Sequence, residues 1–420
     1  MLKDFAILKD RSLLMFFSAR SISLLGNAMA PVALAFAVLD MRGGSATTLG
    51  LVLTARVVAQ VVFVLIGGVV ADRFPRQQVM VAADLAAGVT QAVAAALVIT
   101  GIARPLVLAA LVVVSGAAAA MFAPASRSVM PQLVSGETLQ SANGLLQLSL
   151  RGGNIIGAAL AGVLVAVLGP GPTLLIDAAT FLVSMALISG IRLRHGVSQS
   201  AGGTLLRQLR DGWREFAGRR WVWQTVAQLS FVNLLLAGGF FVLGPVVAKQ
   251  SLGGAPAWGA ILTAQAVGFV TGSALAIRVR PRHPVRTAAL VVMGFPLPLF
   301  LLAAHAPVAA VCALAFVTGM CVDLYGVLID TTLQKRIPSA ALSRVMSYES
   351  VGSMALVPLG SALAGPVSVA VGIGPALVGT GVLMVLAGPV LLLSGTIRHI
   401  EDVPRVDQDA TPMPAQGSTS

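Results

Sequence analysis

Three arginines lie inside long apolar runs of the 420-residue chain, where a charge is costly enough to indicate a function. Arg20, Arg56 and Arg151 each stand about seven to ten residues from an end of their run, which is roughly 10–15 Å deep at the helical rise. A charged side chain at the middle of a bilayer costs about 2.5–3.5 kcal/mol on the insertion scale. A guanidinium at that depth needs an acceptor, which is either a protein carboxylate or a bound substrate. We therefore predict that these arginines contact substrate.

Two neutral polar residues complete the predicted substrate-binding set. Asn27 shares an apolar run with Arg20, and Gln265 stands in the second half of the chain at the place that corresponds to Arg56.

A structural role for the arginines is the alternative. In that case Arg56 and Arg151 form buried salt bridges to acids of neighbouring runs, and the candidate partners are Asp177 and Asp84. Arg20 would instead extend its side chain to the inner membrane interface.

Carboxyl groups within the runs are candidates for carrying a proton, because protonation removes the cost of a buried charge. Asp177, near the outer end of its run, is the first choice, and Glu349, near an inner end, is the second. Asp84 also falls toward an inner end, and we assign it to a charge lock at the cytoplasmic surface.

The composition is that of a membrane protein. Hydrophobic residues make up 57% of the chain and charged residues 10%, against about a quarter charged in soluble domains. The mean hydropathy is +0.90. These values exclude a soluble enzyme and a disordered chain, and the basic excess indicates loop charge rather than nucleic-acid binding. Cys312 and Cys321 show no disulfide or metal spacing, and no phosphate-binding loop is present, so we expect no cofactor, no metal and no enzymatic activity.

Apolar runs long enough to cross a bilayer as helices occur twelve times. They show no alternating polarity, so we predict an all-α integral membrane protein of twelve transmembrane helices rather than a barrel. The runs cover residues 13–39, 47–71, 77–101, 105–130, 141–168, 172–192, 222–247, 257–277, 285–304, 307–330, 345–370 and 374–397.

The distribution of Lys and Arg predicts the orientation. With the N-terminus inside, 22 of the 28 basic residues lie on the inner side and 3 on the outer side. This asymmetry places both termini in the cytoplasm. The basic N-terminal stretch lacks a small-residue cleavage site, so no cleaved signal peptide is expected.

The two halves of the chain repeat each other. LGLVLTAR at 49–56 recurs as WGAILTAQ at 258–265, and four further matches follow in order at offsets of 203 to 209 residues. We predict two six-helix pseudo-repeats, 1–192 and 222–398, with a substrate site between them. The linker 193–221 is expected to hold an amphipathic helix on the inner membrane surface, with an extension of the seventh span as the alternative. The tail 399–420 is expected to be a disordered cytoplasmic segment.

The loop after the second run carries a recognisable motif. Gly68, Asp72, Arg73 and Arg76 stand in the order Gly-Val-Val-Ala-Asp-Arg-Phe-Pro-Arg. This stretch resembles the signature loop of the major facilitator superfamily, with Pro75 where that family usually has glycine. The resemblance implies that these residues gate the inner face through close helix packing and a charge lock.

A wider resemblance covers most of the chain. The stretches 23–34, 71–76, 122–127 and 176–181 resemble the bacterial exporter branch that includes macrolide efflux pumps and siderophore exporters. Asn27 stands where such exporters often carry Asp. The fifth run is similar to the glycine-rich motif of antiporters, which implies gating by Gly157 and Gly162, with tight packing as the alternative.

The resemblance implies a proton-driven secondary transporter of the bacterial plasma membrane that exports a small amphipathic molecule as a monomer. An importer of an organic anion is one alternative, because three buried arginines suit a negative substrate. A non-transporting sensor or scaffold is the other, although the loops are too short for a separate signalling domain.

Overall fold

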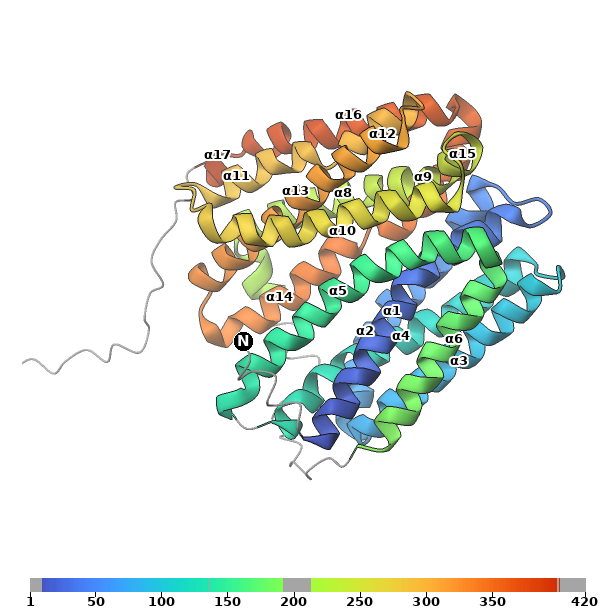
Figure 1. Ribbon diagram of the computed structural model, residues 1–420. Coiled ribbons are helices and arrows are strands. Elements are labelled where there is room, and N and C mark those ends of the chain that lie inside the picture. The colour runs from blue at the N-terminus through green and yellow to red at the C-terminus, as the bar shows by residue number, and fades with distance from the viewer. Residues whose placement is uncertain (1–9, 135, 192–212, 399, 401–420) are drawn as a thin grey trace, which may run out of the picture.

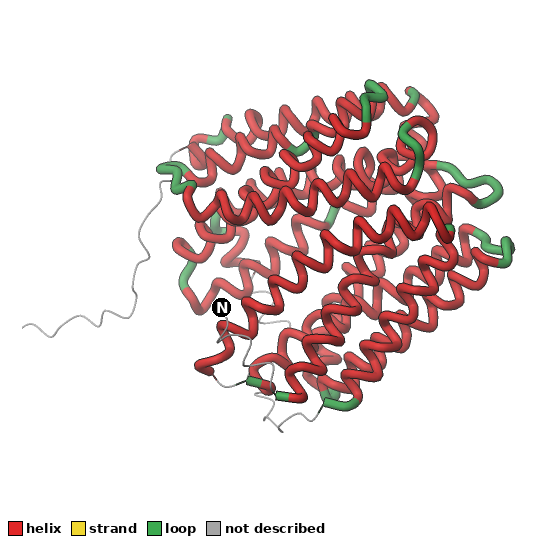
Figure 2. Tube along the Cα trace, viewed as in Figure 1, coloured by secondary structure: helices red, strands yellow, loops and turns green. Residues whose placement is uncertain are grey.

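The computed structural model describes residues 10–134, 136–191, 213–398 and 400, and in these ranges every regular element is a helix (Figures 1 and 2). Most of the predicted linker, and the predicted tail except for residue 400, lie outside the described residues. Within the described part, twelve helical stretches are long and apolar enough to cross a membrane. The predicted fold class, all-α with twelve transmembrane helices, is confirmed.

Six long helices form the first bundle. They are α1 (Arg11–Asp40), α2 (Ala46–Arg73), α3 (Arg76–Ile99), α4 (Pro105–Leu133), α5 (Gly136–Leu168) and α6 (Pro170–Ser189). α1 begins where the Asp10 carboxylate accepts hydrogen bonds from the backbone N–H groups of Ser12 and Leu13, at 2.8 and 3.0 Å. α5 and α6 are separated by Gly169, whose φ of 88° only glycine adopts without strain.

The second bundle has more interruptions than the first. Its elements are α8 (Arg220–Leu236), the π-helix η2 (Ala237–Leu243), α9 (Gly244–Ser251), α10 (Ala255–Arg278), α11 (Pro284–Val291), the 3-10 helix η3 (Val292–Gly294), α12 (Leu297–Ala303), α13 (Val308–Arg336), α14 (Ser339–Met354), α15 (Val357–Val371), α16 (Ile373–Leu392) and α17 (Gly395–Arg398). Three spans are therefore composite: α8–η2–α9, α11–η3–α12 and α14–α15.

Several helices extend beyond the apolar runs that predicted them. α5 begins at Gly136 rather than 141, and α13 ends at Arg336 rather than 330. Hydropathy marks only the stretch that suits the hydrocarbon core, whereas backbone hydrogen bonds continue the helix into the polar interface.

Figure 1 shows α1–α6 and α8–α17 packed as two bundles. Within them α2 runs along α4, α3 along α6, and α10 along α13. Between them α5 packs against α10 and α2 packs against α15. α5 and α10 converge toward the end of the molecule where α1 ends and diverge toward the other end.

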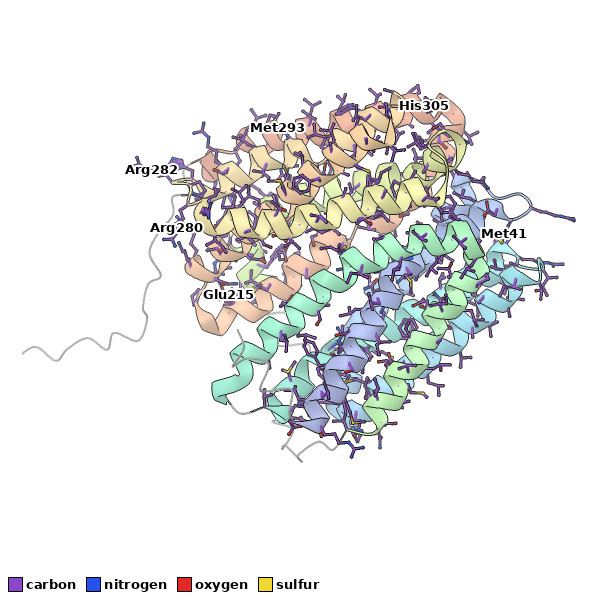
Figure 3. All side chains as sticks on the ribbon, viewed as in Figure 1. Met41, Glu215, Arg280, Arg282, Met293 and His305 are labelled. Atoms are coloured by element: carbon purple, nitrogen blue, oxygen red, sulfur yellow. The ribbon has the colours of Figure 1, made fainter. Side chains whose placement is uncertain are left out.

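The contacts that join the bundles cluster near that convergent end. Lys249 forms a salt bridge with Asp40 at 2.6 Å, and the Thr54 hydroxyl donates a hydrogen bond to the Pro358 carbonyl at 3.0 Å. Figure 3 places Met41, the residue after α1, at this end, whereas Arg280 lies at the opposite end.

Candidate functional site: two polar layers in the first bundle

Five helices of the first bundle each contribute one polar side chain to a single narrow pocket. The contributors are Asn27 from α1, Arg56 from α2, Gln91 from α3, Ser115 from α4 and Asp177 from α6. Asn27, Arg56 and Asp177 were predicted as functional residues, and the fold brings these three together.

Asp177 is the one acid among the described residues of this pocket, and 0% of its surface is exposed. The Gln91 amide donates a hydrogen bond to Asp177 Oδ2 at 2.6 Å. The other oxygen, Oδ1, is buried and has no hydrogen-bond partner in the part of the chain that the structure describes. The carboxyl group thus retains one oxygen that could accept a proton.

Gly26 makes room for this carboxyl group. A Cβ atom on Gly26 would lie 2.3 Å from Asp177 Oδ1, and it would also collide with the Thr180 hydroxyl. α1 therefore approaches α6 at a distance that no larger residue allows, and the glycine closes the pocket on the Oδ1 side.

Arg56 faces Asp177 across the pocket. The guanidinium is within electrostatic range of the carboxyl group, but among the described residues the two form no hydrogen bond or salt bridge. Each group lies close to a charge of opposite sign, and this attraction offsets part of the desolvation cost of burying the two charges in the bundle.

A second polar layer lies in the same bundle. The Ser184 hydroxyl donates a hydrogen bond to Asp84 Oδ2 at 2.6 Å, and these residues are 0% and 2% exposed. Arg20 lies within electrostatic range of Asp84, and its guanidinium carbon is 4.9 Å from the centre of the Phe122 ring. We predicted Asp84 for a charge lock at the cytoplasmic surface, whereas the structure places it inside the bundle.

The two layers are related by a spacing of seven residues on three helices. Arg20 and Asn27 on α1, Asp84 and Gln91 on α3, and Asp177 and Ser184 on α6 form the three pairs. Seven residues are nearly two helical turns, so each pair lies on one face with a rise of roughly 10 Å. Sequence reasoning missed Gln91, Ser115 and Ser184, and this common spacing is the signal that would have pointed to Gln91 and Ser184.

Gln265, another predicted substrate residue, lies in the second bundle. Gln265 is 5% exposed on α10, where its backbone carbonyl packs against Gly319 of α13. The side chain of Arg151, on α5, lies outside the described part of the structure. Gln265 does not line the polar pocket.

The signature loop joins α2 to α3. The side chains of Asp72 and Arg73 and the surroundings of Gly68 lie outside the described part of the structure, and Arg76 begins α3. Gln77 donates hydrogen bonds from its amide to the carbonyls of Ile188 and Ile191, at 2.8 and 2.9 Å. The start of α3 is thereby fastened to the end of α6.

The predicted gating glycines of α5 occupy two kinds of contact. A Cβ on Gly157 would be 2.5 Å from Ala28 Cβ, so this glycine packs α5 against α1 within the bundle. A Cβ on Gly162 would be 3.0 Å from Gly259 Cα of α10, so this glycine lies at the contact between the bundles.

Glu349, the second-choice proton carrier, lies in the other bundle. It is half-buried on α14 and within electrostatic range of Asp330 on α13. Both acids also act electrostatically on the buried phenol of Tyr325. The two predicted proton carriers therefore do not share a site.

The described end of the linker packs on protein. Residues 213–217 form a short helix, and the Phe216 ring stacks on Tyr348 of α14 with centroids 5.8 Å apart. A turn at Gly218 separates this helix from α8. The segment is thus distinct from the seventh span, and Phe216 is 7% exposed, which shows burial against α14.

Comparison with known proteins identifies the family. Residues 3–417 match the family described as transmembrane secretion effector, so the chain belongs to this family of the major facilitator superfamily. It is therefore a transporter that spans the membrane twelve times, and not an enzyme.

Several curated relatives are named as multidrug efflux pumps. The chain is 28% identical over 373 residues to the multidrug efflux pump Tap of Mycolicibacterium fortuitum, with 83% of this chain and 87% of the relative covered. It is 27% identical over 363 residues to the pump Tap of Mycobacterium tuberculosis H37Rv, with 83% and 85% covered.

Solved structures share the fold at low identity. The nucleoside transporter NupG superposes with a TM-score of 0.75 at 12% identity, over 93% of this chain and 99% of NupG. A bacterial homologue of the human lysosomal transporter Spinster, in an inward-facing and unoccupied conformation, gives a TM-score of 0.72 at 15% identity, with 92% and 96% covered.

Proposed function

We propose that this transporter exports a small amphipathic molecule from the bacterial cytoplasm, driven by protons. Its similarity to multidrug efflux pumps over most of both chains supports export. The uneven distribution of Lys and Arg supports a plasma-membrane orientation with both termini in the cytoplasm. A single chain with two bundles is sufficient for transport, so the protein acts as a monomer.

Alternating access is the proposed mechanism. The halves 1–192 and 222–398 would rock against each other and expose the space between them to each side in turn. In the proposed orientation, the end at which Lys249 meets Asp40 faces outward. The observed conformation is then open to the cytoplasm, from which an exporter must load its substrate.

Asp177 is the proposed proton carrier, and its environment is the observation that carries this proposal. The carboxyl group is fully buried, keeps Oδ1 without a hydrogen bond among the described residues, and faces Arg56. Protonation of Asp177 removes the cost of burying its negative charge. Ionisation restores the attraction between the carboxylate and Arg56, which offsets part of that cost. Both protonation states are therefore accessible inside the bundle. Asp177 could therefore take up and release a proton as the two bundles rock against each other.

The position of Arg56 argues for this assignment over anion import. An arginine that recruited an organic anion would direct its guanidinium at the substrate, whereas Arg56 faces an acid inside one bundle. Arg20 likewise faces Asp84 and the ring of Phe122. We assign both arginines to the stabilisation of buried acids.

The remaining sites of the proposal are gates. Gly162 allows α5 to close on α10 at the outer end, since a side chain there would separate the bundles. The signature loop with Gly68, Asp72, Arg73 and Arg76 would lock the inner end in the opposite conformation. Glu349 remains the second candidate for proton transfer.

Efflux from energised cells tests the proposal. Cells that express the transporter would be loaded with a panel of neutral, cationic and anionic fluorescent dyes, and intracellular dye would be followed with and without a protonophore. We expect lower accumulation that the protonophore abolishes. Asp177→Asn is expected to lose uphill efflux but to retain downhill exchange, because Asn cannot carry a proton.

Two matched variants complete the experiment. Glu215→Gln removes a partly exposed acid of the linker and is expected to leave efflux unchanged. Glu349→Gln tests the second candidate. Uphill efflux by both the Asp177→Asn and the Glu349→Gln variants would reject the assignment, and higher accumulation in expressing cells would reject export.

A further inference from the structure

A cavity of about 400 Å³ lies between the two bundles, separate from the polar pocket. Val57, Gln60 and Val61 of α2 form one wall. The other wall comes from α8, η2, α14 and α15 of the second bundle. Pockets that hold small molecules have volumes of about 300–1,000 Å³, so this one accommodates a drug-sized group. A molecule bound here would contact both bundles and would sense their relative motion.

Both spans of the second-bundle wall are irregular at the cavity. The π-helix η2 supplies Ala237 and Phe241. α14 ends at Met354 and α15 begins at Val357, and both of these residues line the cavity. π-helical turns are rare and often occur at functional sites, and transporters commonly bind substrate where spanning helices are discontinuous.

Glycines behind η2 explain how the wall is held. A Cβ on Gly238 would lie 2.8 Å from the Gly360 carbonyl of α15, and a Cβ on Gly239 would lie 2.9 Å from the Thr380 side chain of α16. α15 and α16 therefore support the back of η2 closely, while Phe241 remains available to the cavity.

Three polar side chains face an otherwise apolar lining. Asn233 donates a hydrogen bond from Nδ2 to the Ser353 carbonyl at 3.0 Å, which leaves its Oδ1 available as an acceptor. The amide of Gln60 and the hydroxyl of Ser350 make no hydrogen bond within the described residues. These groups could donate to or accept from a bound molecule.

The lining contains no Asp, Glu, Lys or Arg among the described residues. An ion in such a cavity would lose its hydration without a partner of opposite charge, whereas an apolar group gains from burial. The chemistry thus favours a neutral group that is mainly apolar and carries a few hydrogen-bonding atoms.

We propose that this cavity binds the neutral, apolar part of the exported molecule, with Gln60, Asn233 and Ser350 as the hydrogen-bonding contacts. The statement that the bound ligand is the exported molecule rests on the proposed export function. α2 connects the two sites, because Arg56 stands one helical turn from Gln60 and lines the polar pocket. Movement of α2 would therefore affect both substrate and proton.

Protection of a cysteine from alkylation tests binding without any need for transport. The full-length protein would carry Ser350→Cys with Cys312→Ala and Cys321→Ala, and N-ethylmaleimide labelling would be timed in lipid nanodiscs. The ligands are N-phenyl-1-naphthylamine, which is neutral, and 1-anilino-8-naphthalenesulfonate, which adds a sulfonate to the same skeleton. The neutral dye at about four times its Kd should slow labelling roughly fivefold. The sulfonate at the same concentration should leave the rate unchanged.

Thr331→Cys in the same background is the matched control. Thr331 is exposed on α13 and does not line the cavity. Neither dye should alter its labelling rate, and a slowing there would identify a general membrane effect. Equal protection of Ser350→Cys by both dyes, or no protection by either, would overturn the proposal. Slow labelling that neither dye changes would mean that a lipid chain occupies the cavity, which also overturns it.

A second variant keeps the test independent of the cysteine. Phe241→Ala removes an aromatic contact from the wall and should weaken binding of the neutral dye about tenfold, as measured by dye fluorescence titration. Trp223→Ala, at an exposed position of α8 that does not line the cavity, should leave that affinity unchanged. If dye binding behaves as expected but cells show no efflux, the cavity assignment stands and the proposed export function fails.

Discussion

The ammonium group of Lys249 lies 2.6 Å from the Asp40 carboxylate and ties the second bundle to the first at their convergent end. The same group donates to the Leu39 carbonyl at 2.6 Å, at the C-terminal end of α1 where a helix attracts positive charge. The side chains are 39% and 48% exposed, so the pair contributes about 0.2–1 kcal/mol. That energy is small beside the free energy of folding, but it is comparable to the free-energy difference between two conformations of a transporter.

Lys249→Met should shift the transporter toward the conformation in which this end is open. A loss of about 1 kcal/mol changes the conformational equilibrium roughly fivefold. Spin labels at Ser45 and Gln250 would report the separation of the bundles by pulsed electron resonance. The long-distance population is expected to rise, whereas Lys249→Arg should retain the native distribution. Identical distributions in all three proteins would mean that the pair does not hold the end closed.

Gly26→Ala should destabilise the first bundle. The added methyl would collide with Asp177 Oδ1 and the Thr180 hydroxyl, and overpacking of this kind costs about 1–3 kcal/mol. Thermal unfolding of the purified protein, followed by tryptophan fluorescence, should show a lower midpoint. Gly326→Ala is the control, because a Cβ on Gly326 meets nothing within 4 Å. Equal midpoints for the two variants would contradict the close packing of α1 on α6.

Ser184→Ala should be more costly than an ordinary serine deletion. It leaves Asp84 Oδ2 buried without its 2.6 Å donor, and an unsatisfied buried group costs about 1–3 kcal/mol. Ser368→Ala is the matched change, since among the described residues the buried Ser368 hydroxyl bonds only to the carbonyl of Gly365 in its own helix. Thermal midpoints should fall further for Ser184→Ala. In the Asp84→Asn background, the effect of Ser184→Ala should shrink, and an unchanged effect would argue against the coupling.

Cysteines at the two ends of the molecule should react from opposite sides of the membrane. Ser45 lies next to the end marked by Met41, and Ala217 lies in the helix that carries Glu215 at the other end (Figure 3). In a background without Cys312 and Cys321, an impermeant maleimide applied to whole cells should label Ser45→Cys but not Ala217→Cys. Labelling of only Ala217→Cys would invert the proposed topology.

Local sequence patterns are enough to predict the class of protein and the number of spans. A run of about twenty apolar residues predicts a spanning helix from local composition alone, because the hydrocarbon core leaves no other way to satisfy the backbone. The signature around Asp72 and Arg73 pointed to the superfamily, which the match over residues 3–417 confirms. Both inferences depend on neighbouring residues only.

The contacts between polar residues of different helices depend on how the helices pack. Gln91 and Asp177 are 86 positions apart, and no local pattern shows that α3 and α6 turn these side chains toward each other. The internal repeat predicts a substrate site between the two halves, but not the lining of the cavity beside Gln60. Its walls include a π-helix and a helix break, and no residue type in the sequence marks either of them. Helical spacing defines the face on which a residue lies, but only the packing of one helix against another selects its partner.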